Sequence, residues 1–158
     1  MEDNPHFKEL LRTLNAHKVE FMIVGGYAVM KYTEPRYTKD LDIWVRSAPQ
    51  NAARLYAALA KFGAPLVTDG VTVEDLAHYG MVYQIGRPPL RVDIISRISG
   101  VSFAKAWGRK IRSRMAGVNV YLIGLEDLIR NKRASGRTSD LEHLNALTKL
   151  KQELRSEK

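Results

Sequence analysis

The sequence predicts an α+β domain built on a small mixed β-sheet. The chain has 158 residues, of which 45% are hydrophobic and 27% charged, which suits one packed core and excludes wholesale disorder. Helical and strand patterns alternate along the first half, and a run of strands with two closing helices follows. Because no internal repeat or linker interrupts this order, we expect residues 1–158 to form a single domain.

The first half of the chain predicts three helices and two strands. Apolar residues recur at helical spacing after Pro5, and a short apolar run ends at Gly25 and Gly26 as a buried strand would. Later in this half, polar and apolar residues alternate as in a strand with one buried face, and an alanine-rich helix stops at Gly63. The expected elements are a helix after Pro5, a strand over 20–24, a helix over 27–32, a strand over 40–45 and a helix over 49–61.

The second half predicts two hairpins followed by two helices. Residues 71–80 are ambiguous, although Thr72 could cap a short helix. Glycine-containing turns separate both pairs of apolar runs, which is typical of hairpins. The expected elements are strands over 81–85 and 90–95, a short helix over 103–107, strands over 111–115 and 118–123, and C-terminal helices over about 125–151. The last helix carries leucines at positions 141, 144, 147 and 150 along one side.

Composition excludes several classes of protein. The chain has no cysteine, which rules out disulfides, thiolate metal sites and a cysteine nucleophile. Its four histidines lack metal-ligand spacing, so a structural zinc site is not expected. The acidic N-terminus has no apolar segment typical of a signal peptide, and no apolar stretch is long enough to span a membrane. We therefore expect a cytoplasmic protein with no membrane partner.

The positive charge is concentrated in one part of the chain. The formal net charge is +8, and residues 87–137 hold 12 basic and 3 acidic side chains. Residues 1–86 hold 9 basic and 10 acidic side chains, and residues 138–158 hold four of each. Such a concentration favours polyanionic ligands, nucleic acid or nucleotide phosphates. The alternative is an ordinary solvated basic surface.

Three aspartates form the most informative pattern. Asp40 and Asp42 lie two apart on a predicted strand, so both point away from the core. Asp93 lies within a strongly apolar strand, where an aspartate is rare and costly to desolvate. If these strands are neighbours, three carboxylates converge as a two-metal phosphoryl- or nucleotidyl-transfer site requires, and Mg²⁺ prefers such oxygen ligands. The alternative is that the aspartates only form ion pairs, Asp40 and Asp42 with Lys39, Arg36 or Arg46 and Asp93 with Arg91.

Gly25 and Gly26 follow the first strand and open a helix. Exposed backbone N–H groups at a helix N-terminus bind phosphate well, although a tight strand-to-helix turn would also explain the two glycines. The Walker A, dinucleotide-binding, Gly-x-Ser-x-Gly and His-Glu-x-x-His patterns are all absent. Acyl transfer and zinc proteolysis therefore lack support.

Taken in order, these motifs resemble the nucleotidyltransferase superfamily that shares the DNA polymerase β palm-like fold. The resemblance lies in Gly25-Gly26, the stretch Arg36-Tyr-Thr38-Lys-Asp40-Leu-Asp42-Ile, and Val92-Asp93-Ile94. The C-terminal stretch from Leu125 to Leu141 resembles the AbiEii-like branch, which includes type IV toxin–antitoxin toxins.

The resemblance implies a fold and a set of roles. The fold would be a small mixed sheet with helices packed on one face. Asp40, Asp42 and Asp93 would bind Mg²⁺ or Mn²⁺, and Asp93 could help to deprotonate the acceptor hydroxyl. The implied nucleotide-binding residues are Gly25, Gly26, Arg36, Thr38, Lys132 and Asp140. For Lys132 and Asp140 the alternatives are an ordinary surface lysine and a helix N-terminal acid.

The sequence thus predicts a metal-dependent nucleotidyltransferase that moves NMP from an NTP such as ATP to a hydroxyl group. RNA, for example a tRNA end, or a protein is the favoured acceptor, and a cognate antitoxin is a further expected partner. A non-catalytic domain of the same fold that binds nucleic acid or a protein is the first alternative. An antibiotic nucleotidyltransferase is the second, ranked lower because aminoglycosides are cations.

Overall fold

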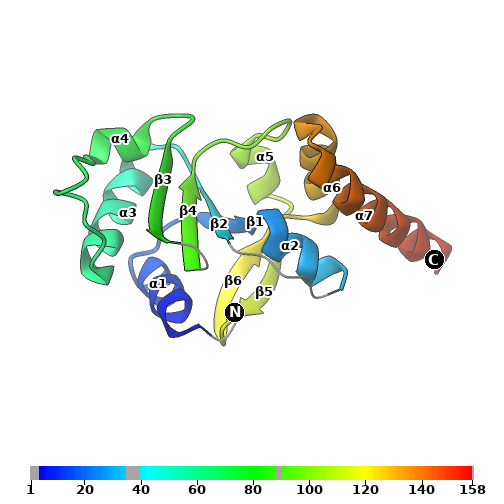
Figure 1. Cartoon of the computed structure of the whole chain (residues 1–158), viewed down its shortest axis with the longest axis horizontal. Coiled ribbons are helices and arrows are strands. Elements are labelled where there is room, and N and C mark those ends of the chain that lie inside the picture. The colour runs from blue at the N-terminus through cyan, green and yellow to red at the C-terminus, as the bar shows by residue number, and fades with distance from the viewer. Residues whose placement is uncertain (1–3, 35–39, 88–89, 158) are drawn as a thin grey trace.

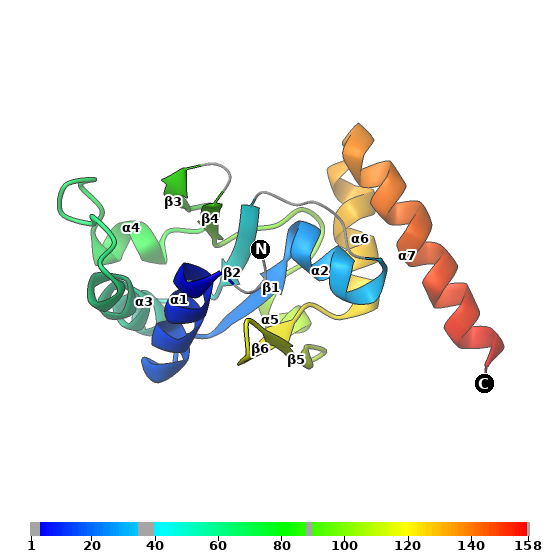
Figure 2. The ribbon, with the colours of Figure 1, turned by 60° about the horizontal axis from the view of Figure 1, so that its bottom comes forward.

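The computed structural model describes residues 4–34, 40–87 and 90–157 and confirms the predicted α+β class (Figure 1). Its centre is a mixed sheet of six strands in the order β3-β4-β2-β1-β6-β5. Helices α3 and α4 lie at one end of the molecule and α6 and α7 at the other, as a second view shows (Figure 2).

The N-terminal elements follow local sequence signals. Helix α1 (Pro5–Ala16) begins after Asn4, whose side chain accepts hydrogen bonds from the first free backbone N–H groups. Strand β1 (Phe21–Val24) is wholly buried and runs directly into α2 (Gly25–Tyr32). Strand β2 (Asp40–Val45) has the predicted bounds, and α3 (Pro49–Phe62) ends at Gly63 in a left-handed conformation.

The ambiguous segment contains α4 (Val73–Ala77), whose first turn is closed by a reciprocal capping box between Thr72 and Asp75. The hairpins then follow as predicted, with ends that differ by no more than two residues. Their strands are β3 (Val82–Arg87) with β4 (Leu90–Ile95), and β5 (Ile111–Met115) with β6 (Val118–Leu122). The short α5 (Phe103–Trp107) lies between the hairpins.

The chain closes with α6 (Leu125–Ser135) and α7 (Thr138–Ser156). Helix α7 packs on α6 and α2 and then extends away from the sheet (Figure 2). The predicted leucine stripe is only partly buried: Leu147 is fully buried, whereas Leu141 is 53% exposed. No helix in the described ranges is both long enough and apolar enough to cross a membrane.

Strand pairing decides which side chains share a face of the sheet. Strand β1 pairs antiparallel with β2 and parallel with β6, and β2 pairs parallel with β4. Ile23 lies opposite both Ile43 and Leu122, so these three side chains share one buried face. We call the opposite face the aspartate face, because Asp42 and Asp93 project from it. Helix α5 packs there, with the Phe103 ring 5.1 Å from that of Trp44.

Candidate active site

The pairing of β2 with β4 brings the three predicted aspartates together. In this parallel register Asp42 lies beside Asp93, and Asp40 lies beside Arg91. Asp40 precedes Asp42 by two residues on the same strand, so all three carboxylates project from the aspartate face. The convergence that the sequence predicted only on condition that these strands were neighbours is therefore present.

Arg91 ties two of the three aspartates to each other. Its Nη2 donates to Asp40 Oδ2 at 2.7 Å and to Asp93 Oδ2 at 3.3 Å, so both carboxylates lie within reach of one nitrogen atom. Asp93 Oδ1 is 3.1 Å from Arg91 Nε but is not aligned with it, and this buried oxygen has no hydrogen-bond partner in the described part of the chain. The Asp93–Arg91 ion pair, which the sequence offered as an alternative to the carboxylate cluster, is thus present in addition to that cluster.

The ionised form of Asp42 is electrostatically unfavourable. Burial, followed by repulsion from Asp93 and Asp40, raises the pKa of Asp42 from 3.8 to about 7, although Lys132 and Arg91 partly offset this rise. A carboxylate whose ionised form is this unfavourable would be stabilised by an added cation. The two cationic groups that lower this pKa, Arg91 and Lys132, are already bonded to other carboxylates.

The Asp42 carboxylate lies directly against the backbone of Gly25. Its φ is +70°, in the left-handed region that side chains rarely adopt. A Cβ at this position would collide with Asp42 Oδ2, so glycine is required both by the turn and by the close approach of the carboxylate. The glycine therefore positions an acid, in addition to any contact with phosphate.

Substituting Gly25 with alanine is expected to destabilise the fold by about 1–3 kcal/mol and to displace the Asp42 carboxylate. Chemical denaturation measures the first effect. Gly70→Ala is the matched control, because Gly70 has φ +69° and a Cβ added there would meet nothing within 4 Å. If both variants lose the same stability, the collision with Asp42 contributes nothing.

Lys132 and Asp140 form a buried clamp between α6 and α7. Lys132 Nζ donates to Asp140 Oδ1 at 2.9 Å, and their side chains are 6% and 2% exposed. Asp140 also accepts from Ser135 Oγ and from Arg137 Nε. Burial alone would raise the pKa of Asp140, but the hydrogen bonds from Ser135, Lys132 and Arg137 outweigh it and hold the pKa well below its usual range. Lys132 is thus no ordinary surface lysine.

A cavity of about 620 Å³ joins Asp40, Asp42, the glycine turn and this clamp, whereas Asp93 is not among its lining residues. Its volume suits a small-molecule ligand of nucleotide size. The predicted site residues that line it are Gly25, Gly26, Asp40, Asp42, Lys132 and Asp140. Residues that the sequence did not single out as site residues also line it, including Arg97, Ser99, Asn131 and Arg137. His143 is only partly exposed and also lines this cavity.

Two predicted nucleotide-binding residues, Arg36 and Thr38, lie outside the described residues, as does Lys39. Arg46, another suggested partner for the aspartates, instead pairs with Glu20 at 2.9 Å. The residue that sequence reasoning undervalued is Arg91. Its signal was present, because Arg91 precedes Asp93 by two residues on a strand and must therefore share its face.

The donor set fits a hard divalent cation. Three carboxylates, one with a buried oxygen that lacks a hydrogen bond, offer the ligands that Mg²⁺ prefers. As the side chains stand in the described ranges, no three acidic or histidine groups are arranged to hold a metal ion together. Arg91 supplies positive charge between Asp40 and Asp93 in this arrangement. Binding of all three carboxylates to metal would require that guanidinium to move.

Solved structures with a similar fold include two nucleotidyltransferase-related proteins. The antibiotic-resistance factor ANT(2'')-Ia aligns with a TM-score of 0.57 at 14% identity, over 96% of this chain and 90% of that one. An antigenic nucleotidyltransferase-like protein from Paracoccidioides brasiliensis aligns with a TM-score of 0.51 at 17% identity, over 89% of this chain and 72% of that one. At these identities the likeness establishes the fold alone.

No curated protein matches the chain. Residues 4–157, nearly the whole sequence, match a family described as nucleotidyl transferase of unknown function (DUF2204). The match supports the superfamily that the motifs resemble, but it does not confirm the AbiEii-like branch. With its six-stranded mixed sheet of nucleotidyltransferase fold, the chain belongs to this nucleotidyl transferase family.

Proposed function

We propose that the protein is a metal-dependent enzyme that transfers a nucleoside monophosphate from an NTP to a hydroxyl group and releases pyrophosphate. The observation that carries the proposal is the meeting of Asp40, Asp42 and Asp93 on neighbouring strands, with Asp40 and Asp42 lining a cavity of about 620 Å³. Burial, together with repulsion from Asp93 and Asp40, raises the pKa of Asp42 to about 7, so the ionised carboxylate is costly to the fold. That cost argues against the alternative of a non-catalytic domain.

The roles follow from the positions of the side chains. Asp40, Asp42 and Asp93 would hold Mg²⁺ or Mn²⁺, which when bound polarises phosphate oxygens and offsets their charge. Gly25 and Gly26 leave room for the triphosphate at the start of α2. Lys132, held by Asp140, faces the same cavity and contributes positive charge near Asp42. Arg36 and Thr38 remain proposed nucleotide contacts on the motif resemblance alone.

In the proposed reaction the acceptor oxygen forms a bond to the α-phosphorus of the NTP. The bond between that phosphorus and the bridging oxygen breaks, and pyrophosphate leaves with the electron pair. The proton of the acceptor hydroxyl passes to a carboxylate, for which Asp93 is the proposed base.

The acceptor that we favour is RNA, for example a tRNA end, or a protein. The fold likeness to ANT(2'')-Ia points to an antibiotic as a second candidate acceptor, but an aminoglycoside is a cation and the second half of this chain is strongly basic. On the resemblance of the motifs we further propose an AbiEii-like, cytoplasmic protein with a cognate antitoxin partner. Co-purification of the protein with the product of a neighbouring gene would test that partner.

The direct test is transfer of label. The protein is incubated with Mg²⁺ or Mn²⁺ and each α-labelled NTP, either alone, with total RNA, or with cell lysate. We expect covalent label in RNA or protein with the native chain and none with Asp42→Asn. Equal labelling by both chains, or no labelling together with no NTP binding in calorimetry, would overturn the proposal.

Replacing Arg91 with glutamine is expected to tighten Mn²⁺ binding by about three- to tenfold, because a competing cation leaves the carboxylates. Isothermal titration calorimetry on the NTP-free protein measures the change. Arg97→Gln is the matched control, since Arg97 lines the same cavity and is exposed. Weaker Mn²⁺ binding by Arg91→Gln would mean that Arg91 assembles the carboxylates for the metal and does not compete with it.

A further inference from the structure

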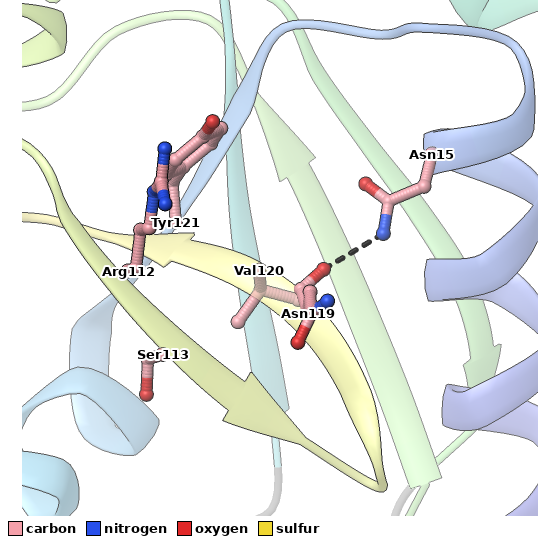
Figure 3. A pocket seen from close by; sticks show the side chains of 6 residues that line it. All are labelled: Asn15, Arg112, Ser113, Asn119, Val120 and Tyr121. Carbon is pink, nitrogen blue, oxygen red and sulfur yellow. Dashed lines mark hydrogen bonds between the residues drawn. The ribbon is translucent and has the colours of Figure 1, made fainter.

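A second cavity, of about 590 Å³, lies on the β5–β6 hairpin (Figure 3). It is lined by Asn15, Arg112, Ser113, Asn119, Val120 and Tyr121. Asn15, near the end of α1, donates from Nδ2 to the backbone oxygen of Asn119 at 2.7 Å and so ties α1 to the hairpin. None of the residues that line this second cavity also lines the cavity at Asp40 and Asp42.

The lining groups suit an anionic ligand with many hydrogen-bonding atoms. They comprise a guanidinium, a phenol, a hydroxyl and two carboxamides, and no carboxylate is among them. Arg112 is exposed, and no carboxylate in the described part of the chain forms an ion pair with it. Arg112 and Tyr121 lie opposite each other on paired strands, and their side chains lie next to each other in Figure 3. A phosphate group is the natural partner for such a guanidinium.

The surroundings of the cavity favour a polyanion over a single phosphate. Residues 94–125 contain six Lys or Arg residues and no Asp or Glu. Within this stretch Lys110 Nζ lies 4.1 Å from the ring centre of Trp107 and 4.7 Å from that of Tyr121, so the aromatic rings hold a cation beside the cavity. Arg109 is different, because it is bonded to the buried Asp127. Cations interleaved with aromatic side chains are typical of surfaces that bind single-stranded nucleic acid.

The strand register places Arg112 and Tyr121 on the aspartate face. Leu122 shares the opposite, buried face with Ile23, so its neighbour Tyr121 projects from the aspartate face, as does Arg112 beside it. Arg112 is three strands away from Asp42 and two residues along, a separation of about 15 Å at ordinary strand spacing. One nucleotide is shorter than this separation. A single strand that reaches both places must therefore be several nucleotides long and must pass around α5, which packs on this face against Trp44 and Tyr121.

We propose that the hairpin cavity binds the phosphate backbone and a base of a single-stranded polynucleotide, several nucleotides away from the end that enters the aspartate site. Arg112 contacts phosphate, and the side chain of Asn119, which projects from the same face of the hairpin, bonds to the base or sugar. That the bound strand is the acceptor rests on the proposed function, but the binding itself does not. A cationic aminoglycoside would be repelled by this surface.

The test is fluorescence anisotropy with labelled single strands of about 12 nucleotides, a length typical of such sites. The full chain is titrated without NTP or divalent metal, over a series of salt concentrations. Arg112→Gln is expected to weaken binding about five- to tenfold and to lower the slope of log K against log salt by about 0.7, the value for one phosphate contact on a single strand. Asn119→Ala is expected to weaken binding about threefold with the slope unchanged, because it removes a hydrogen bond and no charge.

The matched control is Arg54→Gln on α3, which removes another exposed charge, outside both cavities. We expect less than about a twofold change for it. Equal losses with Arg54→Gln and Arg112→Gln would overturn the site in favour of diffuse attraction. Binding of polyglutamate as tight as that of the oligonucleotides would overturn it in favour of an acidic protein. RNA and DNA strands are compared: similar affinities support recognition of the shared phosphate backbone, and tighter RNA binding supports an added 2′-hydroxyl contact.

The two proposals fail independently. If oligonucleotide binding depends on Arg112 but no label is transferred from any NTP, the proposed binding site is supported and the proposed enzymatic activity is rejected. If Arg112→Gln changes neither label transfer to RNA nor oligonucleotide binding, the proposed binding site is rejected and the proposed enzymatic activity is retained. Circular dichroism of each variant confirms that the fold is retained.

Discussion

An Asp42→Asn substitution is expected to reduce nucleotidyl transfer by about a thousandfold or more, the loss that corresponds to several kcal/mol of metal-assisted catalysis. The same substitution is expected to raise the free energy of unfolding above pH 8 by about 2 kcal/mol in metal-free buffer. Loss of activity with gain of stability is the mark of a functional group that is costly to the fold. The two readouts are initial rates with an α-labelled NTP and denaturant unfolding.

The pH dependence of this stability follows from the raised pKa of Asp42. Burial and the neighbouring carboxylates raise this pKa from 3.8 to about 7 in the folded protein. Between about pH 4 and pH 7 the folded chain therefore holds a proton that the unfolded chain has lost. The stability contributed by protonated Asp42 is complete below pH 4 and is lost as the pH rises to 7. Asp42→Asn removes this decline, so the difference between the two proteins grows across that window.

Asp75→Asn is the control of opposite sign. Hydrogen bonds from the backbone and side chain of Thr72 lower the pKa of Asp75, so its contribution to stability is present above its unfolded pKa and is lost on acidification. The substitution should lower stability at neutral pH and change little at low pH. If Asp42→Asn also lowers stability at neutral pH and changes it little at low pH, then the ionised Asp42 carboxylate is not costly to the fold, and this interpretation of the site is wrong.

Lys132→Met is expected to lower the free energy of unfolding by about 3 kcal/mol, because the buried Asp140 carboxylate loses its buried cation and keeps only the exposed Arg137. For a chain of this length that corresponds to a fall in the melting temperature of about 6–12 °C. Adding Asp140→Asn to the same chain should restore part of the loss, since no unpaired charge then remains buried. Thermal unfolding of the two single variants and the double variant measures the coupling.

The matched control is Lys151→Met. Lys151 also joins α7 to α6, at 3.1 Å from Glu126, but that carboxylate is 64% exposed. An exposed pair of this kind contributes little, so we expect a change of no more than about 0.5 kcal/mol. If both lysine variants lose the same stability, the Lys132–Asp140 pair is not the clamp between the helices. A tighter NTP Kd in the Lys132→Met chain would contradict a phosphate contact by Lys132.

Local signals in the sequence were sufficient for most of the elements. Alternation of polar and apolar residues over 40–45 and 90–95 predicted both aspartate-bearing strands with the bounds that the structure shows. Pro5, Thr72 and Gly63 marked helix ends through capping and left-handed geometry, which depend on a few neighbouring residues. The parallel pairing of β1 with β6, between residues about 100 positions apart, had no local signal.

The candidate site shows the same division. By itself the sequence determined that Asp40 and Asp42 share one face of a strand and that Asp93 opposes its core-facing neighbours, because a strand repeats every two residues. Only the tertiary structure decided that β2 and β4 are partners, that Arg91 lies between Asp40 and Asp93, and that Lys132 is buried against Asp140. It alone also placed Arg112 and Tyr121 on the aspartate face. These relations depend on which distant strands and helices pack together, and that choice is made by the free energy of the whole core.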